Sequence, residues 1–323
     1  MARSQRHDSL TAPRLTFMSS PLSHFQLSFA TPRKLPHPNQ LAGRVVVLDI
    51  AFAGSGSSRG FDAVTLPFIR DLGVRLRAWV DHHDHEEHAR FSADPRFILA
   101  TKAEHGACPE MVDPELCARV GPVETIVCHT DFDGLASAAK WVLGGRMPYA
   151  ECDDDARAID TRLGRPSEVA DTIDRALRAR PRDIELCGLV VRHLVGGLQD
   201  IGLQRTIALA AEELRPIEQA TRRAAASFHH VAPGVALVDV TRNPDKLDTT
   251  LLLLLGQERE KVAVVVDRNN LHVAARFDSG MNFLTLFGLP GGMPTRVAVP
   301  RTHAREALRK LGVDPAVVDD CLA

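Results

Sequence analysis

The chain contains Trp79-Val80-Asp81-His82-His83-Asp84-His85-Glu86-Glu87-His88 and Val127-Cys128-His129-Thr130-Asp131-Phe132-Asp133-Gly134, two polar stretches that each follow an apolar run. Such runs are typical of strands that are buried on both faces of a parallel sheet. A third run, Val45-Val46-Val47-Leu48, ends at Asp49. Because ligands bind outside the carboxyl ends of strands in open parallel sheets, we expect one site that is built from three strand ends.

The order of apolar runs and helix-like segments predicts an α/β fold. Alternation of strands and helices indicates a doubly wound parallel sheet, and later strand-like runs at 235–240 and 262–266 indicate a second, smaller α/β domain. A charged helix is expected to connect the two domains. Residues 1–43 are expected to be a disordered tail or to come from a start codon assigned too far upstream. The domain with the three strand ends is expected at 44–205, the connecting helix at 206–230 and the second domain at 231–323.

Composition and charge exclude several classes of protein. The formal net charge of −2 argues against a protein that holds nucleic acid mainly by a basic surface. The six cysteines include no Cys-x-x-Cys pair, so we expect free thiols in a reducing cytoplasm and no disulfide partner. No apolar stretch approaches about 18 residues, which predicts no membrane-spanning helix. The sequence is compatible with a homodimer.

The two polar stretches together resemble the motifs of the DHH phosphoesterase superfamily. Asp81-His82-His83 matches the triplet that names the family, and His129-Thr130-Asp131-Phe132-Asp133-Gly134 matches its His-x-Asp-x-Asp-Gly motif. Asp49 matches the lone Asp that ends a strand in this family. The resemblance extends over roughly residues 44 to 300 and implies a phosphoesterase built on a DHH domain and its associated C-terminal domain.

The order of the motifs differs from the usual order in this family. The His-x-Asp-x-Asp-Gly strand normally comes first, whereas here Asp49 and the Asp81-His82-His83 triplet precede it. A circular permutation would explain this order, because permutation is tolerated when domain termini lie close together at the surface.

The resemblance implies a centre with two divalent ions, Mn²⁺ or alternatively Mg²⁺, for which carboxylate and imidazole ligands are suitable. His129 would bind one ion, His82 would bind the other, and Asp49 would bridge them. Asp153 is an alternative to Asp160 as the last ligand. The complete ligand set implied by the resemblance is Asp49, His82, His129, Asp131, Asp133 and Asp160.

Two further residues of the triplet have implied catalytic roles. His83 would face the phosphate of the substrate. Asp81 would either orient an imidazole or bind a metal directly.

The C-terminal domain of the family implies a substrate-binding set in the second domain. Arg276 matches a strand-end Arg, and Gly291 and Gly292 match a glycine-rich loop. Met293 stands where that loop has His in the family, so the usual substrate is in question.

The sequence therefore predicts a metal-dependent phosphodiesterase that acts on a nucleotide, a short oligonucleotide or a cyclic dinucleotide. One alternative is a pyrophosphatase or polyphosphatase, although the second domain lacks a dense cluster of Arg and Lys. The other alternative is a nucleotide-binding regulatory module without hydrolytic activity.

Overall fold

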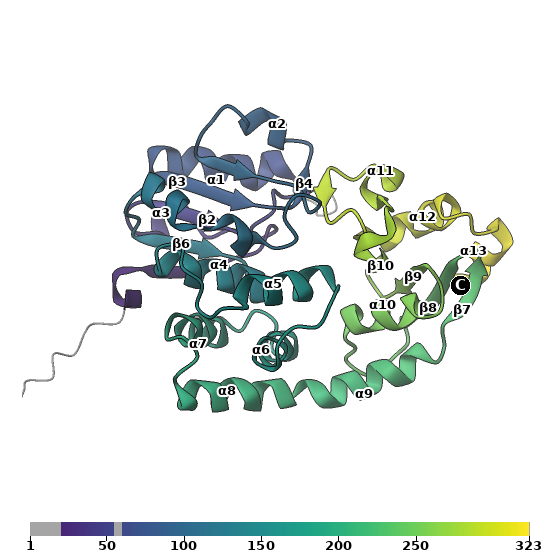
Figure 1. The fold of residues 1–323 in the computed structure, drawn as a ribbon. Helices are drawn as coiled ribbons and strands as arrows, with labels where there is room; N and C mark the ends of the chain where they lie inside the picture. The colour runs from purple at the N-terminus through teal and green to yellow at the C-terminus, as the bar shows by residue number, and fades with distance from the viewer. Residues whose placement is uncertain (1–20, 55–59, 323) are drawn as a thin grey trace, which may run out of the picture.

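The computed structural model describes residues 21–54 and 60–322 (Figure 1). The first sheet has the strand order β1-β6-β2-β3-β5, and all its pairings are parallel. Its strands are β1 (Gln26–Phe29), β2 (Val45–Leu48), β3 (Leu76–Asp81), β5 (Phe97–Leu99) and β6 (Thr125–Cys128). Together with the second sheet described below, it confirms the predicted α/β fold class.

Helices cover both faces of the first sheet because the side chains of a strand alternate between its two faces. Val46 and Leu48 belong to the core on the side of α3 to α8, whereas Val45 and Val47 belong to the core on the side of α1. The helices are α1 (Thr65–Leu72), α2 (His88–Phe91), α3 (Pro114–Val120), α4 (Phe132–Val142), α5 (Cys152–Thr161), α6 (Glu168–Ala179), α7 (Ile184–Val195) and α8 (Ile201–Glu212).

Part of the predicted N-terminal tail belongs to this sheet. Strand β1 pairs in parallel with β6, and Leu27 and Phe29 pack against the core on the α4 side. The short Leu-x-Phe alternation stabilises the strand through this packing, although Ser and Pro residues around it suggested a tail. The prediction of a disordered tail is therefore wrong for these residues, and residues 1–20 lie outside the described part of the chain.

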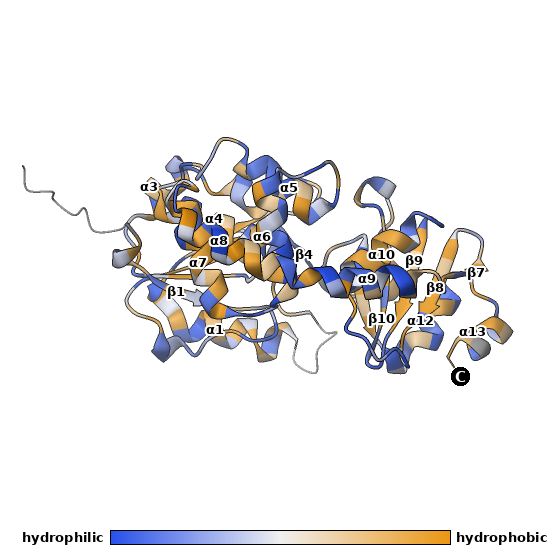
Figure 2. Ribbon diagram, turned by 90° about the horizontal axis from the view of Figure 1, so that it is seen from below, coloured by the Kyte–Doolittle hydropathy of each residue, from blue (hydrophilic) through white to orange (hydrophobic). Residues whose placement is uncertain are grey.

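The predicted connecting helix is two helices, α8 and α9 (Leu214–Ala225), that meet at Glu213. They run one after the other along the lower edge of the molecule in Figure 1, from the first sheet toward the second. Much of α9 is hydrophilic in Figure 2, in agreement with its charged sequence.

The second sheet has the order β12-β10-β9-β8-β7 and is mixed, because β8 and β9 are parallel and the other pairs are antiparallel. Apolar side chains pack on both of its faces. Its strands and helices are β7 (His229–Ala232), β8 (Val235–Asp239), α10 (Thr249–Gln257), β9 (Val262–Val266), β10 (Asn270–Ala275), α11 (Phe283–Phe287), β12 (Arg296–Pro300), α12 (Ala304–Lys310) and α13 (Pro315–Cys321).

A short two-stranded ladder joins the two parts of the molecule. Strand β11 (Gly291–Gly292) pairs with β4 (Asp84–His85), which directly follows the triplet. The Glu86 N–H also donates to the Pro290 carbonyl at 2.9 Å. The glycine-rich segment is thereby fixed beside the strand end that carries His82 and His83.

Within the described residues, no helix combines the length and hydropathy needed to cross a membrane.

Candidate metal centre

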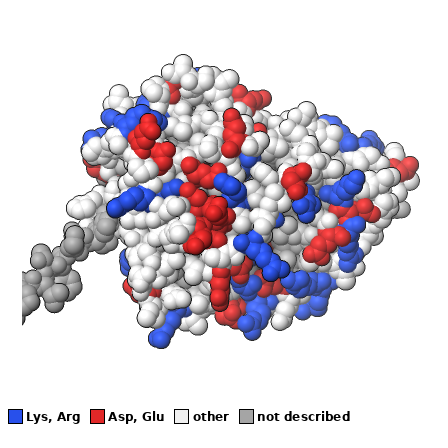
Figure 3. Space-filling view, in the orientation of Figure 1, with Lys and Arg blue, Asp and Glu red and all other residues white. Residues whose placement is uncertain are grey.

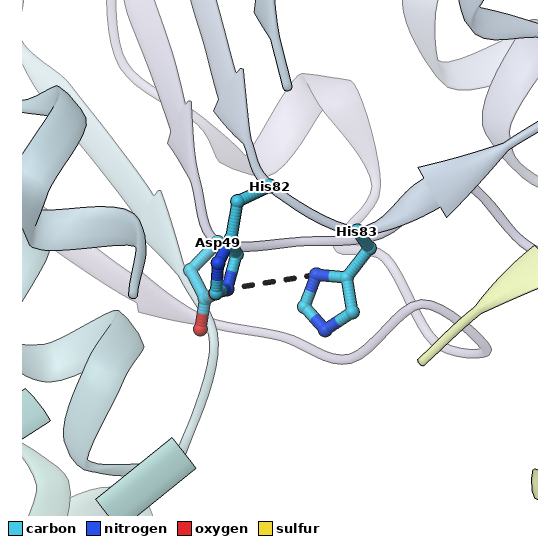
Figure 4. Close-up of side chains that lie close together, drawn as sticks. All are labelled: Asp49, His82 and His83. Carbon is cyan, nitrogen blue, oxygen red and sulfur yellow. Dashed lines mark ion pairs between the residues drawn. The ribbon is translucent and has the colours of Figure 1, made fainter. Parts of the chain in front are cut away.

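Three adjacent strands bring the predicted ligands together. Strand β2 lies between β6 and β3, with Leu48 level with both Cys128 and Val80. The residues that follow these strands therefore emerge at one edge of the sheet, and Asp49 lies between His82 and His129. Figure 4 shows Asp49 beside His82 and His83. The structure thus brings these strand ends together although they are far apart in the sequence.

The backbone at Asp49 has a conformation that is uncommon for a residue other than glycine. Its φ is 56°, in the left-handed region, and its N–H donates to the Val80 carbonyl at 2.9 Å. Asp tolerates this region better than most residues, and the resulting strain is often found at functional sites. The turn directs the carboxylate into the space between the two histidines.

The carboxylate of Asp49 is buried, and neither oxygen accepts a hydrogen bond from the described residues. His82 Nε2 is 3.3 Å from Oδ1, and His129 Nδ1 is 3.7 Å from Oδ2. Burying a carboxylate without a hydrogen-bond donor destabilises the folded state by on the order of 1–3 kcal/mol or more. A divalent cation would offset this cost, so the donors present suit a metal ion.

A backbone contact orients the ring of His82. Its Nδ1 lies 2.9 Å from the carbonyl oxygen of His105, so the Nδ1–H donates there and Nε2 faces the acids. Metal-binding histidines commonly use one nitrogen in this way. Nε2 lies 3.0 Å from Asp133 Oδ2 and 4.0 Å from Asp160 Oδ2.

The His129 motif continues directly into helix α4. Asp131 is the N-cap, and its side chain accepts the Gly134 N–H at 3.1 Å. A Cβ at Gly134 would lie 2.7 Å from the His129 carbonyl oxygen, which explains the glycine. The close turn places Asp131 Oδ2 2.8 Å from His129 Nδ1.

Among the residues that the structure describes, the donor atoms form three overlapping groups, each compact enough for one ion. The first group is Asp49, His82 and His83, the second is Asp49, His129 and Asp131, and the third is His82, Asp133 and Asp160. An ion with bonds of about 2.0–2.2 Å needs donor atoms no more than about 4.4 Å apart. The separations of 2.8 and 3.7 Å around His129 meet this requirement. The cluster could therefore hold a divalent metal.

Mutual repulsion among the acids perturbs their protonation. Burial, followed by the carboxylates of Asp133 and Asp131, raises the pKa of Asp49 well above its ordinary range. Burial lowers the pKa of the His129 imidazole, but the carboxylates of Asp131, Asp49 and Asp133 together raise it to about 9. Burial raises the pKa of Asp131, and His129 brings it below the ordinary value.

The two residues with implied catalytic roles contact each other. Asp81 is fully buried, and its Oδ1 accepts from His83 Nδ1 at 2.8 Å. Burial lowers the pKa of the His83 imidazole to about 4, with a further contribution from Lys102. Figure 4 shows the second ring nitrogen of His83 directed away from Asp49.

The two candidates for the last ligand lie in different surroundings. Asp160 belongs to the cluster, whereas Asp153 pairs with Lys140 at 2.7 Å. Sequence reasoning missed Lys102, whose Nζ lies 2.8 Å from His82 Nε2 and also contacts Asp160 Oδ2. Lys102 follows closely after β5, which pairs in parallel with β3, the strand that leads to His82. Its position after a further strand end was the signal that could have identified it from the sequence.

The second sheet brings Arg276, which the sequence indicated, and a further arginine to the cavities beside the cluster. Arg276 is exposed and pairs with Asp278 at 2.8 Å, although it lines a cavity of about 400 Å³ with Asp160. Gly291 and Gly292 form β11, so their backbone pairs with β4. Sequence reasoning missed Arg296, which lines both this cavity and a neighbouring one of about 480 Å³ that reaches His129 and Asp131.

The charged surface agrees with the near-zero net charge. Acidic and basic side chains are interspersed on the face shown in Figure 3, without one extended basic area.

Comparisons with known proteins give little information about this chain. No protein-family model matches it, and no curated protein matches it at a significant level. Among solved structures, it is similar to a pGpG-specific phosphodiesterase, PggH, from Vibrio cholerae, with 13% identity and a TM-score of 0.35. The match covers 53% of this chain and 66% of that chain, just under two thirds of its length. Similarity at this level does not establish family membership, so function must be inferred from the residues of the site.

Proposed function

We propose that this chain is a metal-dependent phosphoesterase that hydrolyses a phosphodiester of a nucleotide, a short oligonucleotide or a cyclic dinucleotide. The observation that carries this proposal is the buried carboxylate of Asp49, which has no hydrogen-bond donor and lies between His82 and His129. Oxygen and imidazole donors suit Mn²⁺ or Mg²⁺. When bound, such an ion supplies Lewis-acid polarisation of a phosphoryl oxygen.

In this proposal, Asp49, His129 and Asp131 hold the ion. Asp49 follows β2, whereas His129 and Asp131 follow the neighbouring strand β6, so the paired strands fix their relative positions before any ligand binds. Asp131 keeps its role as a helix cap while its second oxygen faces His129. The site therefore needs little rearrangement to bind a cation.

His83 is proposed to orient the attacking water. Asp81 accepts the Nδ1–H, which leaves Nε2 of the neutral imidazole as an acceptor. Because the pKa of His83 is lowered to about 4, the ring is neutral near pH 7. Nε2 then accepts a hydrogen bond from the water as its oxygen attacks phosphorus and the bond to the leaving oxygen breaks. The water releases its proton to solvent, and the leaving oxygen takes one from solvent.

The cavities beside the cluster have the size and charge for a phosphorylated ligand. Their volumes of about 400 and 480 Å³ lie in the range typical of small-molecule sites. Arg162 and Arg296 line both cavities together with Asp160. A guanidinium group binds phosphate oxygens through two parallel hydrogen bonds, so these residues would bind a second phosphate of the substrate.

The basic residues around these cavities make the pyrophosphatase alternative more plausible than the sequence of the second domain alone indicated. The second sheet alone has few cations near the site, but Arg162 and Arg182 join Lys246 and Arg296 around the larger cavity. Arg178 also lines it, yet Asp174 and Asp248 both pair with that guanidinium.

A substrate screen tests the proposal. The purified full chain is incubated with Mn²⁺, Mg²⁺ or EDTA and with a linear dinucleotide, a cyclic dinucleotide, bis-p-nitrophenyl phosphate and pyrophosphate. We expect phosphodiester hydrolysis that needs the metal and is lost in Asp49→Asn. Exclusive hydrolysis of pyrophosphate would support the alternative enzyme. Nucleotide binding without turnover in any metal would indicate a binding module.

A further inference from the structure

Lys102 places a fixed positive charge inside the candidate metal centre. Its side chain is 2% exposed, and its ammonium contacts both His82 Nε2, at 2.8 Å, and Asp160 Oδ2. These two atoms belong to the group of His82, Asp133 and Asp160, which is compact enough to hold an ion. The lysine therefore lies among the donors of one potential ion position.

The ammonium and an ion would need the same space. His82 Nε2 and Asp160 Oδ2 are 4.0 Å apart. An ion bonded to both atoms at about 2.0–2.2 Å must lie close to the midpoint between them. An ammonium group that is hydrogen-bonded to both atoms lies only roughly 2 Å from that midpoint. The two cations cannot be present there together.

The backbone around Lys102 holds the side chain in this position. The Lys102 N–H donates to Asp84 Oδ2 at 3.2 Å. The surrounding turn is closed by the His105 N–H, which donates to the Thr101 carbonyl at 3.1 Å. The His105 carbonyl in turn accepts from His82. One turn thus fixes both the lysine and the imidazole that it contacts.

The hydrogen bonds of the Lys102 ammonium do not extend to the group around His129. The contacts of Lys102 are directed to His82 and Asp160, whereas the donors of the other group are Asp49, His129 and Asp131. The other two groups found among the described residues both include His82, whose Nδ1 bonds to the His105 carbonyl and whose Nε2 contacts Lys102. Of these three groups, the one around His129 is therefore the one open to a metal ion.

We infer that this centre holds a single divalent ion, at Asp49, His129 and Asp131, and that the ammonium of Lys102 takes the place of a second ion. The inference rests on the proposed metal site and replaces the two-ion centre implied by the sequence resemblance. A lysine charge at this position is permanent, whereas occupancy by a second ion would depend on metal concentration. Activation by Mn²⁺ should accordingly follow a single-site curve.

Metal counting tests the inference without relying on activity. The EDTA-treated full chain is titrated with Mn²⁺ by calorimetry, and bound metal is counted by elemental analysis after gel filtration. Electron paramagnetic resonance then distinguishes an isolated Mn²⁺ ion from an exchange-coupled pair. We expect one isolated ion per chain in the wild type. In Lys102→Met, which keeps an unbranched side chain without charge, we expect two ions per chain and a coupled signal.

Two further variants serve as controls. Lys102→Arg keeps the charge and should keep one ion. Lys140→Met removes another buried lysine, one that pairs with Asp153 away from the site, and should also keep one ion. If Lys102→Met fails to fold, Lys102→Gln retains an N–H donor toward Asp160 without the charge and should bind two ions.

The outcomes separate this inference from the proposed function. Two ions or a coupled signal in the wild type would overturn the role of Lys102 and leave the phosphoesterase proposal intact. One ion in the wild type and still one in a folded, uncharged Lys102 variant would also overturn it. No bound metal in the wild type would refute the metal site itself, and both proposals with it.

Discussion

Asp131 combines a structural contact with a proposed metal contact, and a single substitution separates the two. Asp131→Asn keeps the oxygen that caps helix α4 by accepting the Gly134 N–H, because Asn and Asp are equally good N-caps. It removes the negative charge that faces His129. We expect Mn²⁺ affinity and turnover to fall by at least about 100-fold, while the far-UV circular dichroism stays unchanged.

Thermal unfolding with and without Mn²⁺ checks the assignment of Asp131. An ion at 100 times its Kd stabilises the folded state by about 2.7 kcal/mol. The wild type should show this metal-dependent rise in Tm, and Asp131→Asn should not. An equal rise in both proteins would exclude Asp131 as a ligand.

The protonation of His129 should make the stability of the metal-free protein depend on pH. Burial lowers its pKa, but the carboxylates of Asp131, Asp49 and Asp133 together raise it to about 9, compared with about 6.5 in an unfolded chain. The folded state therefore binds the proton more tightly. This stabilisation is complete below pH 6.5 and disappears as the pH rises through 9.

Urea unfolding of the EDTA-treated wild type and His129→Gln, measured between pH 6 and 9.5, tests this dependence. The stability difference between the two proteins should be greatest at about pH 6 and should shrink toward pH 9.5. A difference that is constant over this range would show that the folded state does not raise the pKa of His129.

At the scale of the elements, the ladder between β4 and β11 positions the second sheet beside the metal centre. A Cβ on Gly291 would lie 2.4 Å from His85 Cδ2 and 2.5 Å from the Asp84 carbonyl oxygen. Backbone cannot yield as a flexible side chain can, so Gly291→Ala should break this pairing at a cost of about 1–3 kcal/mol.

Hydrogen exchange is the direct measurement for this ladder. The Glu86 N–H, which donates to Pro290, should exchange faster in Gly291→Ala. Gly188→Ala is the matched control, because Gly188 lies in helix α7 and a Cβ added there would have no atom of another part of the described chain within 4 Å. That control should be neutral or slightly stabilising, since Ala favours helix over Gly. Unchanged exchange at Glu86 in Gly291→Ala would mean that the ladder does not hold the two parts together.

At the scale of the whole molecule, substrate selectivity should depend on the cavities between the two sheets. Arg296 is half-buried, donates to Thr250 Oγ1 at 2.9 Å and lines both cavities. Arg276, which the sequence resemblance implied, lines only one of them, and its side chain is 66% exposed and paired with Asp278. Arg296 is therefore the better candidate for a contact with a remote part of the substrate.

Kinetics of Arg296→Ala and Arg276→Ala test this assignment on the best substrate and on bis-p-nitrophenyl phosphate. Arg296→Ala should lower kcat/KM for the best substrate at least about 10-fold more than for the small diester, because only the larger substrate uses remote binding energy in the transition state. Arg276→Ala should lower both by less than about 3-fold. The reverse order of effects would favour the role that the sequence implied for Arg276.

The α/β class and the candidate ligands could be predicted from the amino-acid sequence. Continuous Val and Leu runs are typical of buried parallel strands, and polar residues directly after such runs must lie at the carboxyl edge of the sheet. Asp49, His82 and His129 could therefore be placed at one edge from pattern alone. The short strand β1 escaped detection because four residues carry little periodicity, and their packing against the core stabilises the strand.

The other groups that join those ligands could not be predicted from the sequence, because folding brings them together from distant segments. Lys102 comes from the turn after β5 and Arg296 from the second sheet, and neither is marked by a motif of its own. Their positions depend on the strand order and on the β4–β11 ladder, both of which are long-range pairings. Local sequence specifies strands and turns, whereas the identity of a buried ion pair depends on which strand ends meet after folding.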